Sequence, residues 1–171
     1  PGKSCGECIY CHSIANAEEL CTNRKCYGIS FNVNKPPHLG GGYSEKVYLN
    51  GNFNVYHIPQ DWPMGFGAIL ETIAVGVNAV DRVLIKTSPA DNRKMTAVII
   101  GAGAVGMSVA LAFMKKDVEV SVIEPVDARR NLAKELGAKK VYDKYILSDD
   151  WENAFADDFG GMKPDIVVES A

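Results

Sequence analysis

Three glycines between a strand-like run and a helix-like run constrain the fold more than any other feature. They form the pattern G-x-G-x-x-G directly after the apolar residues 98–100 and directly before an apolar helical segment. In that context the first glycine permits a tight turn, the second lets the backbone approach a pyrophosphate, and the third lets the helix pack closely on the strand. The helix N-terminus offers unpaired amide groups to the anion. The sequence predicts a dinucleotide-binding turn rather than a purely structural one, with these cofactor-binding residues: Gly101, Gly103, Ala104, Val105 and Gly106.

An acidic residue follows the next strand-like run at the position that the dinucleotide fingerprint requires. Glu124 ends the apolar run 120–123, about 20 residues after the turn. A carboxylate there accepts hydrogen bonds from the adenosine ribose hydroxyls and repels a 2′-phosphate, so NAD is favoured over NADP. Three interpretations of Arg129 stay open: it partly offsets that repulsion, it stacks beside the adenine, or it is a solvated cation in the first turn of a helix.

Strand-like and helical segments alternate from the turn to the end of the chain. Such alternation indicates βαβ units and a parallel sheet, and hence an α/β fold. The sequence predicts strands at 96–100, 119–123, 140–142 and 165–169, and helices at 104–115 and 127–136, the second closed by Gly137.

The earlier part of the chain has a different pattern. Residues 1–63 carry all five cysteines, and the β-type runs Tyr43–Leu49 and 53–58 predict antiparallel strands joined by an Asn50-Gly51 turn. Residues 66–84 show helical periodicity, and a polar connector follows at 86–94. The apolar residues expected on the buried face of that helix are Ile69, Ile73, Val77 and Val80. We expect two domains, residues 1–66 and 67–171.

The cysteines have the spacing of a metal site. Cys5, Cys8 and Cys11 are separated by two residues each, and Cys21 and Cys26 follow. Thiolates at this spacing converge on one tetrahedral ion, and four of them make a closed, structural zinc site. A disulfide framework is disfavoured by the odd number of cysteines, and an iron–sulfur site by the long gap after the third cysteine.

The order of these motifs resembles the medium-chain zinc-dependent alcohol and polyol dehydrogenases. The residues that carry the resemblance are Cys5-Gly-Glu-Cys8-Ile-Tyr-Cys11, Glu19-Leu-Cys21, Gly41-Gly-Tyr43-Ser-Glu-Lys-Val47, Leu70–Val77, Ala97–Val105 and Ala133–Ala138. The resemblance implies part of a GroES-like β lobe with a structural zinc loop, followed by a partial Rossmann sheet. It also implies a homo-oligomeric parent protein.

The resemblance assigns the structural zinc ligands to Cys5, Cys8, Cys11 and Cys21. The last gap is two residues longer than in the family, so Cys26 is an alternative fourth ligand. Glu71 matches an acidic position that reaches the catalytic zinc in polyol-type members, although Thr72 follows it where the family has proline. A carboxylate held by backbone amides at a helix start is the other interpretation of Glu71.

The family's remaining catalytic-zinc ligands, a cysteine and a Gly-His-Glu segment, are not found in this sequence. Its histidines, His12, His38 and His57, stand in unrelated contexts, and a water-facing loop residue is favoured over a zinc ligand for His12. The resemblance therefore implies an internal fragment of an NAD-dependent, zinc-containing dehydrogenase that transfers a hydride between an alcohol or polyol and NAD, and that is inactive alone. A non-catalytic zinc- and nucleotide-binding module is the alternative; an iron–sulfur electron carrier is a weaker one.

Composition excludes several other classes. A net charge of −3 provides no basic field for nucleic acid. The uncharged run 95–114 is long enough for a membrane span, but its glycines and the absence of aromatic flanks favour a buried strand and helix. With no leader pattern at the start, we expect a cytoplasmic protein whose partner is a small alcohol or polyol.

Overall fold

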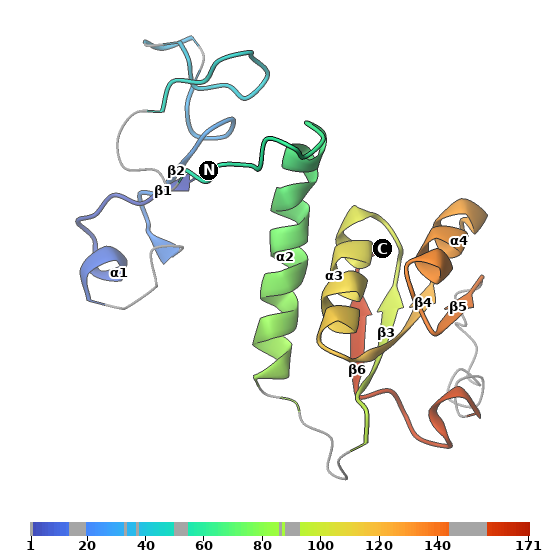
Figure 1. Ribbon diagram of the computed structural model, residues 1–171. Helices are drawn as coiled ribbons and strands as arrows, with labels where there is room; N and C mark the ends of the chain where they lie inside the picture. The colour runs from blue at the N-terminus through green and yellow to red at the C-terminus, as the bar shows by residue number, and fades with distance from the viewer. Residues whose placement is uncertain are drawn as a thin grey trace. The chain divides into compact units, whose positions relative to one another are not determined.

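The computed structural model describes residues 2–13, 20–32, 34–36, 38–49, 55–85, 87, 93–143 and 157–171. The chain divides into two compact units, Pro1–Pro59 and Gln60–Ala171 (Figure 1). The domains expected from sequence, residues 1–66 and 67–171, stay a prediction. None of the described helices has the length and apolar character that crossing a membrane requires.

The second unit contains a parallel four-stranded sheet. Its strands are β3 (Thr96–Ile100), β4 (Glu119–Ile123), β5 (Lys140–Tyr142) and β6 (Ile166–Glu169), in the order β5-β4-β3-β6. Every pair in this sheet is parallel. The connections include α3 (Ala104–Lys115), α4 (Asp127–Glu135) and the short 3-10 helix η2 (Asp157–Phe159). The α/β fold class with a partial Rossmann sheet is confirmed, and the strands and helices lie within a residue of the predicted bounds.

The two faces of the sheet have separate cores because side chains alternate along each strand. Ala97, Ile99, Val120 and Val122 belong to the larger core, together with residues of the flanking helices. Val98 and Ile123 point to the opposite face, where Phe159 of η2 packs against them. The central strands β3 and β4 are thus buried on both sides, which explains their continuous apolar runs.

Helix α2 (Phe66–Leu84) forms where the periodicity predicts it, but only part of the predicted face is buried. It packs along α3 (Figure 1) through Gly76 and Val80. Ile69, Ile73 and Val77 are 50%, 36% and 42% exposed, so the predicted buried face is wrong apart from Val80.

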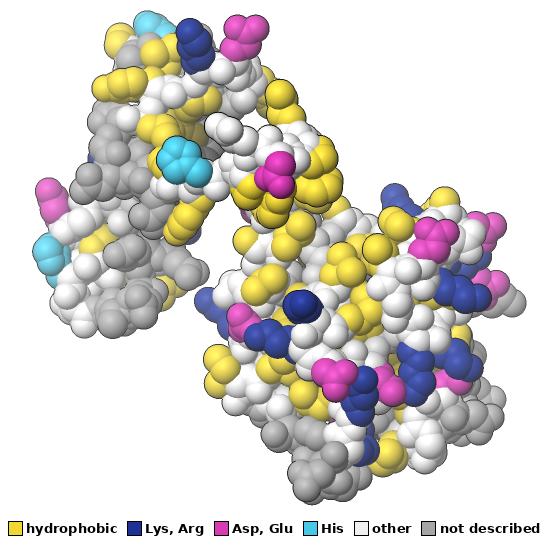
Figure 2. Space-filling view, in the orientation of Figure 1, with side chains coloured by type: hydrophobic (Ala, Val, Ile, Leu, Met, Phe, Trp, Pro, Cys, Tyr) yellow, Lys and Arg dark blue, Asp and Glu magenta, His cyan; other side chains and the backbone are white. Residues whose placement is uncertain are grey.

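The contact with α3 is made between backbones at Gly76. A Cβ atom on Gly76 would lie 2.6 Å from the Ser108 carbonyl carbon and 2.8 Å from the Val109 nitrogen, both in the backbone of α3. Consecutive helical residues point about 100° apart, so docking at Gly76 points Val77 away from α3. Ile69 and Ile73, seven and three residues before Gly76, share its face and are exposed nearer the start of the helix. Figure 2 shows hydrophobic side chains at the surface over this helix.

The first unit has little regular structure among its described residues. Strand β1 (Gly2–Lys3) pairs antiparallel with β2 (Lys25–Cys26), and the one-turn helix α1 spans Ile9–His12. Residues 43–49 and 55–58 form no strands, so the predicted hairpin is wrong there; its Asn50-Gly51 turn lies outside the described residues. Tyr43 and Tyr56 are exposed, and a hairpin without an apolar surface to cover is marginal at best. The GroES-like lobe stays a prediction.

Candidate functional site

Four cysteine side chains of the first unit come together at one point. The Sγ atoms of Cys5, Cys8, Cys11 and Cys21 all lie within 4.8 Å of one another. The Sγ atoms of Cys8 and Cys11 are 3.5 Å apart, and those of Cys5 and Cys11 are 3.9 Å apart. Four sulfurs at 2.3 Å from a tetrahedral zinc would be roughly 3.8 Å apart. The donor set and its size therefore fit a single zinc ion.

Backbone amides around the group donate to its sulfur atoms and so favour the deprotonated thiolate form. The amide nitrogen of Cys5 donates to the Cys21 Sγ at 3.2 Å, and that of Glu7 donates to the Cys5 Sγ at 3.4 Å. The Glu7 amide lowers the pKa of Cys5. Burial raises the pKa of Cys8, but the backbone and thiol hydrogen bonds of Cys11 outweigh it and the pKa falls to about 6. Burial raises the pKa of Cys11 to about 11.

The other residues considered as metal ligands lie elsewhere. Cys26 belongs to β2, where its amide donates to Ser30 Oγ at 3.0 Å, and its thiol is not part of the group. His12 is exposed at the end of α1, and Glu71 is exposed on α2. Among the residues that the structure describes, the four cysteines are the only cluster of three or more metal-ligating side chains.

The glycine turn lies at the C-terminal end of β3, in the second unit. Gly101 has φ +91°, a conformation that side-chain-bearing residues rarely adopt. Its amide donates to the Ile123 carbonyl at 2.8 Å, which holds the turn beside the end of β4. A Cβ atom on Gly106 would overlap the Gly101 carbonyl oxygen, so only glycine allows α3 to approach the turn this closely.

The outer side of the turn is open. A Cβ atom on Gly103 would meet nothing within 4 Å, and Ala104 and Val105 are exposed. Gly103 is the N-cap of α3, and no side chain caps the helix there. The first amides of a helix have no acceptor within it. The turn thus offers free N–H groups and unoccupied space, the two requirements for an anion.

Glu124 is buried, with 2% of its surface exposed, and its carboxylate joins two backbone segments. Oε2 accepts from the Ala102 amide at 2.8 Å, and Oε1 accepts from the Val126 amide at 2.9 Å. Burial raises the pKa of this carboxyl, but the Val126 and Ala102 amides lower it more, so its pKa lies below the ordinary value. Glu124, the residue expected to bind a ribose, thus also holds the glycine turn through its hydrogen bond with the Ala102 amide.

Two arginines of α4 flank Glu124. Arg129 Nη1 lies 3.8 Å from Glu124 Oε2, and the Arg129 side chain is 56% exposed. Arg130, which the sequence patterns did not single out, donates from Nη1 to the Glu124 carbonyl at 2.6 Å and pairs with Asp127. Arg129 is therefore the more available of the two for an incoming ligand.

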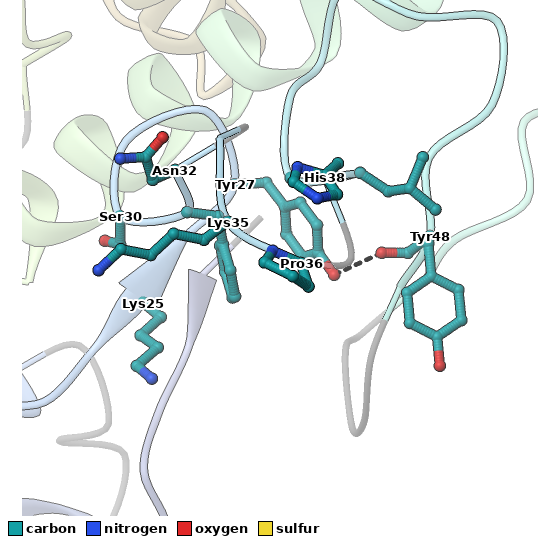
Figure 3. Close-up of a pocket in the computed structure, with 11 residues that line it drawn as sticks. Lys25, Tyr27, Ser30, Asn32, Lys35, Pro36, His38 and Tyr48 are labelled. Carbon is teal, nitrogen blue, oxygen red and sulfur yellow. Dashed lines mark hydrogen bonds between the residues drawn. The ribbon is translucent and has the colours of Figure 1, made fainter.

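The first unit also contains a cavity of about 410 Å³ (Figure 3). Its lining includes Lys25, Lys35 and His38, and the Tyr27 hydroxyl at its wall donates to the Tyr48 carbonyl at 2.6 Å. No metal-group cysteine and no residue of the glycine turn lines it.

The sequence patterns missed one residue at the turn. Ser170 follows β6, and its hydroxyl lies 2.9 Å from the Ile100 carbonyl oxygen and 3.1 Å from that of Gly101. The position of Ser170 after a strand was visible in the sequence, but that β6 pairs with β3 was not.

Known proteins resemble this chain along most of its length, although no protein-family model matches it. A 2-dehydro-3-deoxy-L-galactonate 5-dehydrogenase of Pseudoalteromonas atlantica is 31% identical over 137 residues, which cover 80% of this chain and 35% of that protein. An uncharacterized zinc-type alcohol dehydrogenase-like protein of Haemophilus influenzae is 25% identical over 149 residues, or 87% of this chain and 39% of that protein. The crystal structure of an alcohol dehydrogenase from Thermotoga maritima matches with a TM-score of 0.83 and 28% identity, over 99% of this chain and 46% of that one.

These matches extend through both compact units. The chain spans 35% and 39% of the two curated relatives' lengths. Its sequence relatives and structural neighbours are zinc-type medium-chain alcohol and polyol dehydrogenases, and the chain is a homologue of that family over most of its length.

Proposed function

We propose that this chain is part of an NAD-dependent, zinc-containing alcohol or polyol dehydrogenase. Its first unit holds a structural zinc ion, and its second unit binds the adenosine and pyrophosphate half of NAD. The observation that carries the proposal is the open glycine turn at the end of β3, with the Glu124 carboxylate beside it. The four-cysteine group in the same chain supports it.

The metal part of the proposal rests on the chemistry of the donors. Four thiols within 4.8 Å provide the soft ligands and the tetrahedral spacing that zinc prefers. With all four positions taken by protein, no position remains for water or substrate, so the ion stabilises the loop and takes no part in hydride transfer. We assign the ligands to Cys5, Cys8, Cys11 and Cys21.

The cofactor part rests on the turn and on α4. Gly101, Gly103 and Gly106 shape a turn that a pyrophosphate can approach, and the amides of Ala104 and Val105, in the first turn of α3, are the proposed donors to it. Bound NAD supplies the ring that accepts the hydride, and a catalytic zinc supplies Lewis-acid activation of the alcohol oxygen. Glu124 would accept from the adenosine ribose and disfavour a 2′-phosphate. Arg129 would lie beside the adenosine.

The chain alone is expected to have no turnover. Glu71 is the only residue proposed to reach a catalytic zinc, and among the described residues no second ligand cluster accompanies it. One exposed carboxylate does not hold a catalytic ion, which takes three protein ligands.

Three measurements on the purified chain test the proposal. Elemental analysis is expected to find one zinc per chain, and calorimetric titration is expected to detect binding of NADH and of ADP-ribose, each tighter than NADPH. Alcohol-dependent reduction of NAD is expected to be absent. Failure to bind ADP-ribose would remove the cofactor assignment, whereas turnover would refute the inactivity of the chain.

A non-catalytic zinc- and nucleotide-binding module is the second candidate. It is favoured by the absence of a catalytic ligand cluster from the described residues. The sequence of the parent gene distinguishes the two candidates, because an upstream Gly-His-Glu segment supports the enzyme.

The remaining assignments concern setting and assembly. A cytoplasmic location suits a group of four thiols, because that compartment keeps cysteines reduced. A homo-oligomeric parent stays a prediction from the family resemblance, and the absence of a nucleic-acid partner stays a prediction from the net charge.

A further inference from the structure

The end of β6 lies against the glycine turn. β6 is in register with β3 up to the pair Ile100–Glu169, and the Ser170 amide extends this ladder by donating to the Ile100 carbonyl at 2.9 Å. A Cβ atom on Gly101 would lie 2.9 Å from the Ala171 Cα. The turn therefore has backbone of another strand directly behind it.

The Ser170 hydroxyl fills the space between the turn and α3. It lies 3.1 Å from the Gly101 carbonyl oxygen, and 2.5 Å from the position that a Cβ atom of Gly106 would occupy. Because the backbone turns at Gly101, the carbonyl of this residue leaves the direction of the β ladder and needs a partner of its own. The hydroxyl is a donor within reach of it, and the hydroxyl's other acceptor, the Ile100 carbonyl at 2.9 Å, already accepts from the Ser170 amide.

One peptide group of the turn is thereby held at both ends. Its carbonyl, from Gly101, faces the Ser170 hydroxyl, and its N–H, from Ala102, donates to Glu124 at 2.8 Å. A peptide group is planar, so fixing both ends fixes its orientation. The next residue is Gly103, which begins the open side of the turn.

We propose that Ser170 is a positioning residue of the dinucleotide site. Its hydroxyl and the Glu124 carboxylate clamp the peptide group between Gly101 and Ala102, which keeps Gly103 and the first amides of α3 aimed at the pyrophosphate. This inference rests on the proposed cofactor site and adds to it a residue that need not touch the ligand. A pre-organised turn binds more tightly because less freedom is lost on binding.

The test compares Ser170→Ala with wild type in titrations of two ligands, ADP-ribose and adenosine. Loss of the hydroxyl is expected to raise the Kd for ADP-ribose about 3- to 10-fold, the effect of one lost hydrogen bond. The Kd for adenosine, which lacks the pyrophosphate, is expected to stay within about twofold of wild type. NMR hydrogen exchange at the Ala102 amide is expected to be faster in the variant without any ligand.

Ser108→Ala is the matched control. Ser108 is buried, and its hydroxyl also donates to a carbonyl, that of Ala104 at 2.7 Å, but it lies on the side of α3 that faces α2. The role of Ser170 would be overturned if Ser108→Ala raised the Kd for ADP-ribose as much as Ser170→Ala does. It would also be overturned if Ser170→Ala left the Kd for ADP-ribose or the exchange rate of the Ala102 amide unchanged, or if it weakened the binding of ADP-ribose and of adenosine equally. Wild type that does not bind ADP-ribose would instead refute the cofactor site itself.

Discussion

Cys21 and Cys26 differ in the position of their thiols relative to the other cysteines. Cys21 is 7% exposed and its sulfur accepts from the Cys5 amide, whereas Cys26 lies in the β1–β2 ladder. The sequence left both as candidates for the fourth ligand. The structure brings only the first into the group, because pairing of Cys26 with Gly2 directs that part of the chain along the ladder.

The substitutions Cys21→Ser and Cys26→Ser distinguish the two cysteines. Cys21→Ser is expected to weaken zinc binding at least 10-fold, because losing a zinc ligand lowers the affinity no less than losing a residue that hydrogen-bonds to a ligand. Cys26→Ser is expected to keep one zinc per chain. Competition with a chromophoric chelator measures both affinities, and equal zinc loss in the two variants would exclude the assignment.

Asp165 provides a residue-level prediction about pH. The Arg93 guanidinium lowers the pKa of this carboxyl to about 2; burial opposes it, and hydrogen bonds from Thr96 assist. The carboxylate accepts from Arg93 Nη1, the Thr96 amide and the Thr96 hydroxyl at 2.8, 2.8 and 3.0 Å. Since the folded pKa lies below the ordinary value of 3.8, the ionised form stabilises the fold above that pH.

This stabilisation is expected to disappear as the pH falls from about 4 to about 2. Asp165→Asn should lower the free energy of unfolding by about 1.5–3 kcal/mol at neutral pH, and should flatten its dependence on pH in that window. The control is Asp81→Asn, which removes a half-exposed ion pair with Lys116 and should change the free energy of unfolding by less than about 1 kcal/mol. Urea titrations at several pH values measure these differences; identical acid profiles for wild type and Asp165→Asn would contradict the assignment.

At the scale of elements, the contact between α2 and α3 depends on a residue without a side chain. A methyl group at Gly76 has no flexible neighbour to displace, because the atoms it would meet belong to the backbone of Ser108 and Val109. The two helices would have to separate, which would disturb Val80 and the core beneath it.

Gly76→Ala is therefore expected to destabilise the second unit by about 1–3 kcal/mol, despite the higher helix propensity of alanine. Gly65→Ala is the matched control: Gly65 precedes the same helix with φ −62°, and a Cβ atom there would meet nothing within 4 Å. It should alter stability by no more than about 0.5 kcal/mol. Thermal unfolding followed by circular dichroism compares the two, and a neutral Gly76→Ala would argue against the close packing.

At the scale of the whole molecule, the two units have very different cores. Among the described residues of the first unit, Cys21 and Gly40 are the only buried ones, whereas the second unit buries aliphatic side chains on both faces of its sheet. A unit with so little apolar core needs another source of stability, and metal binding is the one that its cysteines offer.

Chelation of the metal is therefore expected to unfold the first unit and leave the second intact. Calorimetry with and without a strong zinc chelator should show loss of one transition and no shift of the other. Amide protection in β3 and β4 should be unchanged, which identifies the surviving transition. A chelator that lowers both transitions equally would indicate that the units unfold together.

The parts of the fold that depend on neighbouring residues were predictable from the sequence. Strands β3 and β4 and helix α3 follow from apolar runs and from Gly101, Gly103 and Gly106, because these patterns act within a few residues. The predicted hairpin at 43–49 and 55–58 failed because a strand also requires a partner and a surface to cover. The burial predicted for Ile69, Ile73 and Val77 was wrong because hydrophobic periodicity does not register where along α2 the neighbouring helix makes contact, and that contact is at Gly76.

The sequence by itself determined the α/β class, the position of the glycine turn and the candidate metal thiols, since local spacing carries all three. Only the tertiary structure decided that Cys21 rather than Cys26 joins the group and that Glu124 also holds the turn. It likewise placed Ser170 behind Gly101, about 70 residues away along the chain. Such contacts depend on which strands pair and how closely helices pack, and no pattern of neighbouring residues encodes that.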